Sequence, residues 1–165
     1  MTVIAVKVEE DKITIASDSQ TTYGYRKQIK ENTTKLTKIS DDFIVGSSGL
    51  AKVNQLLELF CETVKPKNNS SREIIRFFKS FETWLDKEAS SKLDTNNFLF
   101  ILDKKVFHFD EYYLLEVKDY YAIGSGSDYA LVALELGQSA ERAVQSACKL
   151  DIFCNEPIKT FEVLF

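Results

Sequence analysis

The chain has 165 residues, of which 44% are hydrophobic and 28% charged, and this composition predicts one folded domain spanning residues 1–165. A net charge of −4 without a block of Lys or Arg argues against nucleic acid binding, and no apolar run approaches the roughly 18 residues of a membrane span. Three cysteines without CxxC spacing and a single histidine provide little material for a metal centre, a disulfide framework or a His-based triad. For the same reason we expect no metal or other cofactor. Because no signal-peptide pattern precedes the first strand, we expect a cytoplasmic protein.

Short apolar and β-branched runs in the first part of the chain, together with one segment of alternating polar and apolar residues, predict four strands. These strands are expected at Val3–Val8, Ile13–Ala16, Lys35–Ile39 and Phe43–Gly49. The polar segment 18–25 is expected to be a loop.

Two amphipathic helices are predicted next. Apolar residues at helical spacing run from Val53 to Val64, and Pro66 ends this first stripe. A second, more aromatic stripe runs from Ile74 to Leu85, and it is interpreted as core or subunit interface. Such a helix pair covers one face of a sheet.

The second half of the chain repeats the order of strands followed by helices. Strands are expected at Asn97–Leu102, Lys105–Phe109, Tyr113–Glu116, Tyr120–Ile123 and Phe161–Leu164, and helices at Tyr129–Leu136 and Ala140–Lys149. The separate blocks of strands and helices indicate an α+β fold, and two helix pairs with two strand sets permit four layers, helix–sheet–sheet–helix.

The most informative candidate for chemistry is Thr2, directly after Met1. Removal of Met1 would place a free amine, with a reference pKa of about 7.7–8.0, on the residue that carries the hydroxyl. One residue would then supply both nucleophile and base. Many proteins begin with Met-Thr, however, and most of them are not hydrolases, so Thr2 alone does not indicate a nucleophile.

Other segments have a structural and a functional interpretation. Asp18, after the second strand, is either a turn residue or a partner of Thr2 across the hairpin. The turn Gly46–Gly49 is either a close-packed strand-to-helix connection or a source of N–H donors for an oxyanion. The similar segment Gly124–Asp128 lacks the residues of a nucleotide-binding loop, and His108 is interpreted as half-buried scaffold.

Six segments, in the same order along almost the whole chain, resemble proteasome β subunits and the bacterial HslV peptidase. They are Met1–Lys7, Ile15–Gln20, Lys35–Ile39, Val45–Ala51, Tyr121–Ala130 and Ala147–Ile152. The resemblance implies the N-terminal-nucleophile hydrolase fold, a four-layer αββα sandwich. It also implies a threonine-type endopeptidase that acts inside homo-oligomeric stacked rings on unfolded chains delivered by an ATP-dependent unfoldase.

The resemblance further implies roles for individual residues. Thr2 would be the nucleophile, Asp18 would pair with Lys35 (aligned in preference to Lys30 and Lys38), and the Gly49 N–H would be the oxyanion donor. Ser125 and Asp151 match supporting residues around the Thr2 amine. The walls of the substrate side-chain pocket would be Thr21, Thr33, Ser47 and Ala51.

The chain departs from the family pattern at Cys154-Asn155, where the family usually has Ser or Thr, often followed by Gly. The hydroxyl of the supporting network is therefore missing or replaced by a thiol. Two alternatives remain open at this stage: a catalytically inactive ring-forming protein, and a small-molecule amidohydrolase of the same fold.

Overall fold

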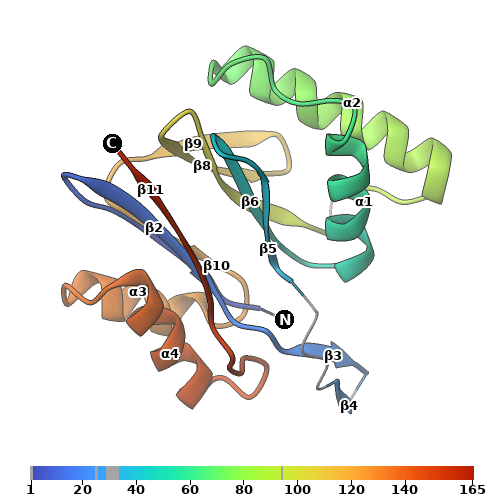
Figure 1. Ribbon diagram of the computed structural model, residues 1–165. Coiled ribbons are helices and arrows are strands. Elements are labelled where there is room, and N and C mark those ends of the chain that lie inside the picture. The colour runs from blue at the N-terminus through green and yellow to red at the C-terminus, as the bar shows by residue number, and fades with distance from the viewer. Residues whose placement is uncertain (1, 25, 29–33, 94) are drawn as a thin grey trace.

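The computed structural model describes residues 2–24, 26–28, 34–93 and 95–165 (Figure 1). The strands are β1 (Ile4–Val8), β2 (Lys12–Ser17), β3 (Thr21–Tyr23), β4 (Arg26–Gln28), β5 (Leu36–Ser40), β6 (Phe43–Ser48), β7 (Asn97–Leu102), β8 (Lys105–Asp110), β9 (Tyr113–Val117), β10 (Tyr120–Ile123) and β11 (Lys159–Leu164). The helices are α1 (Ala51–Cys61), α2 (Ser71–Ala89), α3 (Ser127–Glu135) and α4 (Ala140–Leu150). No helix within the described ranges is both long and apolar enough to cross a membrane.

Two antiparallel sheets lie between two pairs of helices (Figure 1). One sheet has the strand order β10-β1-β2-β11, and α3 and α4 cover its outer face. The other has the order β5-β6-β7-β8-β9, and α1 and α2 cover its outer face. The four-layer α+β sandwich that the element order predicts is confirmed.

The alternation of side chains along each strand produces the layers. In β1, Ile4 and Val6 face the opposite sheet, whereas Ala5 faces α3 and α4. In β6, Ile44 faces the opposite sheet, whereas Val45 faces α1 and α2. Both sheets therefore bury both faces, and the structure has a separate apolar cluster at each of its three layer boundaries.

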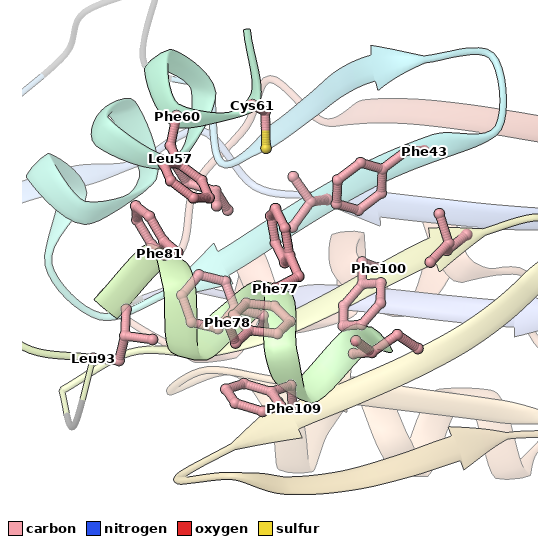
Figure 2. Packing of buried hydrophobic residues seen from close by; sticks show 14 of the residues in the cluster. Phe43, Leu57, Phe60, Cys61, Phe77, Phe78, Phe81, Leu93, Phe100 and Phe109 are labelled. Carbon is pink, nitrogen blue, oxygen red and sulfur yellow. The ribbon is translucent and has the colours of Figure 1, made fainter. Parts of the chain in front are cut away.

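The aromatic stripe of α2 lies in the core, between α1, α2 and the five-stranded sheet (Figure 2). Phe78 stacks on Phe109 with ring centroids 3.9 Å apart, and Phe77 meets Phe43 edge to face. Of the two interpretations that the sequence permits for this stripe, the structure therefore supports core packing.

The structure corrects the predicted elements in two places. Segment 18–25 is not simply a loop, since Thr21–Tyr23 pairs with Arg26–Gln28 as a short two-stranded ribbon. The helix α1 ends at Cys61 and does not reach Val64, which is 38% exposed. Val64 keeps the apolar spacing beyond the end of the helix, but its side chain is exposed.

Candidate active site

Antiparallel pairing brings the ends of several strands together at one edge of the sandwich. Ile4 at the start of β1 is opposite Ser17 at the end of β2 and Ile123 at the end of β10. The residues just outside these strands, Thr2, Asp18 and the turn after β10, are therefore neighbours.

Asp18 is fully buried and is the centre of this arrangement. Its Oδ1 accepts hydrogen bonds from the Val3 N–H at 2.9 Å and from Lys35 Nζ at 2.7 Å. Its Oδ2 accepts from the N–H groups of Gln20 at 3.0 Å and Asn155 at 3.2 Å. All these partners are donors, which is the set that an ionised carboxylate requires when it leaves water.

Lys35 is 8% exposed, and its ammonium shares Oδ1 of Asp18 with the Val3 N–H. The cation therefore lies beside the Thr2–Val3 peptide. The backbone of Lys35 is fixed as well, because the Lys35 carbonyl accepts from the Ser47 N–H at 3.2 Å. Asn54 Nδ2, on α1, donates to the carbonyl of Thr34, the residue before Lys35, at 3.0 Å. Asn54 Oδ1 accepts from the Ser47 hydroxyl at 3.2 Å.

Ser125, in the turn between β10 and α3, contacts both ends of Thr2. The Thr2 nitrogen donates to Ser125 Oγ at 3.2 Å, and Ser125 Oγ in turn lies 3.3 Å from the Thr2 carbonyl oxygen. The Gly126 N–H donates to the same carbonyl at 3.1 Å. Gly124 has a φ of +96°, and a side chain there would collide with the Thr2 carbonyl, so this turn requires glycine.

Asp151 supports Ser125 from the end of α4. Burial alone would raise the pKa of Asp151, but hydrogen bonds from the Phe153 N–H, Ser125 and Cys154 outweigh it and lower the pKa. The Cys154 thiol lies 3.3 Å from Asp151 Oδ2 and 4.0 Å from Ser125 Oγ. Burial, followed by the nearby charge of Asp18, raises the pKa of Cys154, so the thiol stays protonated and can donate. The thiol of Cys154 therefore lies where it can donate to Asp151.

Gly49 lies between the end of β6 and the start of α1 with a φ of +131°. A Cβ atom there would collide with the Thr95 carbonyl oxygen and would lie 2.7 Å from Cγ of Asn96. Only glycine fits this backbone, and no side chain of its own obstructs its N–H.

The comparisons with known proteins agree with this architecture. The ATP-dependent protease subunit HslV of Caldicellulosiruptor saccharolyticus is 28% identical over 181 residues, covering 98% of this chain and 97% of the relative. The chain is therefore similar to an HslV protease subunit over almost its whole length. No profile of a protein family matches the chain.

Solved structures of other proteins have the same fold. Thiobacillus denitrificans BPH superposes with a TM-score of 0.90 in its complex with epoxomicin and 0.89 without this ligand, at 20% identity. In these pairs the match covers 98% of this chain and 98% or 97% of BPH. HslV from Trypanosoma brucei superposes with a TM-score of 0.78 at 22% identity, with 99% of each chain covered.

The structure describes three of the four residues that the family resemblance assigns to the substrate pocket. Ser47 is buried beside the Lys35 backbone, and its hydroxyl donates to Asn54 Oδ1. Ala51 is exposed at the start of α1, and Thr21 opens β3 with a buried Oγ that has no hydrogen-bond partner among the described residues. Thr33 lies outside the described residues, as does Met1.

His108, the only histidine, is more buried than its expected half-buried position, with 7% exposure on β8. Its ring faces Tyr121 of the opposite sheet at 4.7 Å, and burial lowers its pKa. His108 therefore belongs to the boundary between the sheets and not to the Thr2 site.

Sequence reasoning missed the amide side chains around the site. Asn54, Asn96 and Gln20 are each at most 6% exposed, and each hydrogen-bonds to the backbone of another segment. No spacing rule identifies such residues. A buried position for Asn54 is nevertheless implied by the apolar stripe of α1, since Val53 and Leu57 lie on the same face.

Proposed function

We propose that this chain is an N-terminal threonine peptidase, in which Thr2 acts as the nucleophile once Met1 has been removed. The observation that carries the proposal is the buried Lys35–Asp18 ion pair, held against the Thr2–Val3 peptide. A buried ion pair contributes little net stability compared with apolar residues of the same volume. Its position beside the backbone of Thr2 therefore favours a chemical role.

The proposed reaction begins with transfer of the Thr2 hydroxyl proton to the Thr2 amine. The hydroxyl oxygen forms a bond to the substrate carbonyl carbon, and the carbonyl π electrons move to oxygen, where the Gly49 N–H stabilises the anion. The ammonium then protonates the leaving nitrogen as the C–N bond breaks. Water attacks the remaining ester, the amine accepts its proton, and the acid product leaves while Thr2 Oγ regains a proton.

The charges around Thr2 suit these steps. The Lys35 cation favours the neutral form of a nearby amine and stabilises the developing alkoxide, and Asp18 offsets its charge. Ser125 accepts from the Thr2 nitrogen in the Met1-containing chain, where that nitrogen is a peptide nitrogen. After removal of Met1, the same contact would orient the free amine.

We propose a cytoplasmic assembly of homo-oligomeric stacked rings that receives unfolded chains from an ATP-dependent unfoldase. The relative named an ATP-dependent protease subunit supports this proposal. Large apolar side chains on the helices, including Leu59, Val132 and Leu150, are between 51% and 62% exposed and would provide contacts between subunits. The substrate pocket would be lined by Thr21, Thr33, Ser47 and Ala51. Native mass spectrometry of the purified protein tests the rings: a monomer at all concentrations would contradict them.

Hydrolysis of short fluorogenic peptides tests the peptidase. We expect Thr2→Ala to abolish turnover and Lys35→Ala to lower kcat by about 10²–10⁴-fold, the range of proton-transfer catalysis. Matched controls are Thr160→Ala on the exposed side of β11 and Lys38→Ala, whose lysine forms a surface pair with Asp41. Equal activity of the Thr2 variant and the wild type would contradict the proposal.

The comparisons favour this function over the two alternatives, the inactive ring-former and the small-amide hydrolase. The same assay separates them. An inactive ring-former would assemble without cleaving any amide, and a small-amide hydrolase would cleave small amides but no peptide.

A further inference from the structure

Asn96, in the connection between α2 and β7, is 3% exposed and hydrogen-bonds to both backbone polar groups of Leu50. Its Oδ1 accepts from the Leu50 N–H at 3.1 Å, and its Nδ2 donates to the Leu50 carbonyl at 3.3 Å. We propose that Asn96 is a positioning residue that directs the Gly49 N–H toward the reacting carbonyl. This inference rests on the proposed peptidase function.

The argument starts from the freedom of Gly49. Glycine does not restrict its own φ and ψ, so the direction of its N–H depends on what holds the residues on either side. On one side, Ser48 is held by its pairing with Asn97 in the β6–β7 ladder. On the other side, Leu50 is the N-cap residue of α1. Its carbonyl accepts from the Val53 N–H at 3.0 Å, but no side chain of its own segment caps the helix. Asn96 supplies the side-chain anchor, and it binds the Leu50 N–H from a part of the chain 46 residues away.

The amide of Asn96 is fixed in this orientation by a second contact. The Thr95 hydroxyl donates to the same Oδ1 at 3.3 Å, so the oxygen faces the two donors and the NH₂ group faces the Leu50 carbonyl. The side chain also packs directly against Gly49, since a Cβ atom on that glycine would lie 2.7 Å from Asn96 Cγ. Asn96 therefore restrains Gly49 both through the next peptide and by contact.

Two variants of Asn96 separate positioning from general support. Asn96→Asp has the same shape and keeps an acceptor for the Leu50 N–H, but its second oxygen faces the Leu50 carbonyl and repels it. Asn96→Ala removes both hydrogen bonds. The matched control is Asn97→Ala, which removes the amide of the neighbouring residue but keeps the backbone through which that residue pairs with Ser48.

The readouts are kcat and KM for a fluorogenic peptide and the inhibition constant of a peptide aldehyde. The aldehyde adds to the Thr2 hydroxyl and places a tetrahedral oxygen where the substrate oxyanion forms. We expect both Asn96 variants to lower kcat by about 10- to 100-fold with KM within about twofold of wild type. The inhibition constant should rise by a similar factor, and Asn97→Ala should stay within about twofold of wild type in both readouts.

Folded Asn96→Asp and Asn96→Ala proteins with wild-type kcat would overturn the inference while the peptidase proposal stood. The same holds for a rise in KM at constant kcat, or for an equal loss in Asn97→Ala. If Asn96→Ala does not fold, Asn96→Asp decides alone. A wild-type protein that begins at Thr2 and neither turns over peptides nor binds the aldehyde would overturn the proposed function, and this inference with it.

Discussion

Replacement of Asp18 by Asn tests the role of the buried carboxylate in stability. The amide has nearly the same shape, but it has one acceptor oxygen where Asp18 has two. If this oxygen keeps the Val3 N–H and Lys35 Nζ, the NH₂ group faces the N–H groups of Gln20 and Asn155. The two buried backbone donors then lose their acceptor, at about 1–3 kcal/mol each. The Lys35 cation also loses its ionised partner, and breaking a buried pair in this way costs about 3–5 kcal/mol.

Because the lost hydrogen bonds and the broken ion pair involve the same side chain, their costs are not additive. We therefore take the cost of the broken pair, about 3–5 kcal/mol, as the expected loss in the free energy of unfolding, a large part of the roughly 5–15 kcal/mol of a typical domain. Urea unfolding followed by fluorescence of the single tryptophan, Trp84 on α2, measures this change. With a slope of about 2 kcal/mol per molar, the midpoint would fall by roughly 1.5–2.5 M. Protein concentration must be equal in all samples, because assembly would add to the apparent stability.

The control is Asp41→Asn, which removes a fully exposed carboxylate that is also 2.7 Å from a lysine, Lys38. Because water screens this pair, we expect its midpoint to match that of the wild type. A change of less than about 1 kcal/mol for Asp18→Asn would refute the reasoning, since it would mean that the four donors do not depend on the charge of Asp18.

Three further predictions concern titration, thiols and the core. The pKa of the Asp151 carboxyl is lower in the folded than in the unfolded chain. Its contribution to stability is therefore complete above the unfolded pKa, about 3.9, and is lost as pH falls through the folded pKa. Between pH 5 and 2 the wild type should lose more stability than Asp151→Asn in acid-unfolding curves, and equal losses would contradict the shift. Burial raises the pKa of Cys61 to about 12, so at pH 8 iodoacetamide should label this thiol only after unfolding, as mass spectrometry would show; rapid labelling of the folded protein would contradict the burial. Phe78→Ala, which removes a 1% exposed ring stacked on Phe109, should cost about 3–5 kcal/mol in urea unfolding, whereas Phe165→Ala, at a 52% exposed position, should change little; equal effects would contradict the packing.

Strands could be predicted from the sequence where the pattern of apolar residues matches the way their side chains are buried in the fold. The apolar runs in Val3–Val8 and Phe43–Gly49 predicted strands, because a strand with side chains buried on both sides of a sheet is apolar almost throughout. The β3–β4 ribbon was missed because its residues are polar and it packs little, so no apolar alternation marks it. The end of the first helix was predicted too late, at Val64, because an apolar residue at helical spacing does not by itself continue a helix.

Some contacts of the candidate site were expected from the sequence, and others were not. The pairing of Asp18 with Lys35 was expected from the family resemblance, and the structure has this ion pair. The hydrogen bonds of Asn96 to Leu50 could not be predicted, because they join segments 46 residues apart through an amide that no motif marks. The Cys154 thiol was noticed as a departure from the family, but only the structure shows that it lies within reach of Asp151.

The central claim is that Thr2 becomes the first residue and that its hydroxyl and amine act together. Intact mass and fragment spectra of the protein purified from its own cells, with and without a peptide epoxyketone that reacts with both groups, test it most directly. We predict a chain that lacks Met1 and carries one inhibitor on Thr2, with no adduct on the Thr2→Ala variant. A chain that retains Met1, or one that begins at Thr2 and remains unmodified, would contradict the claim.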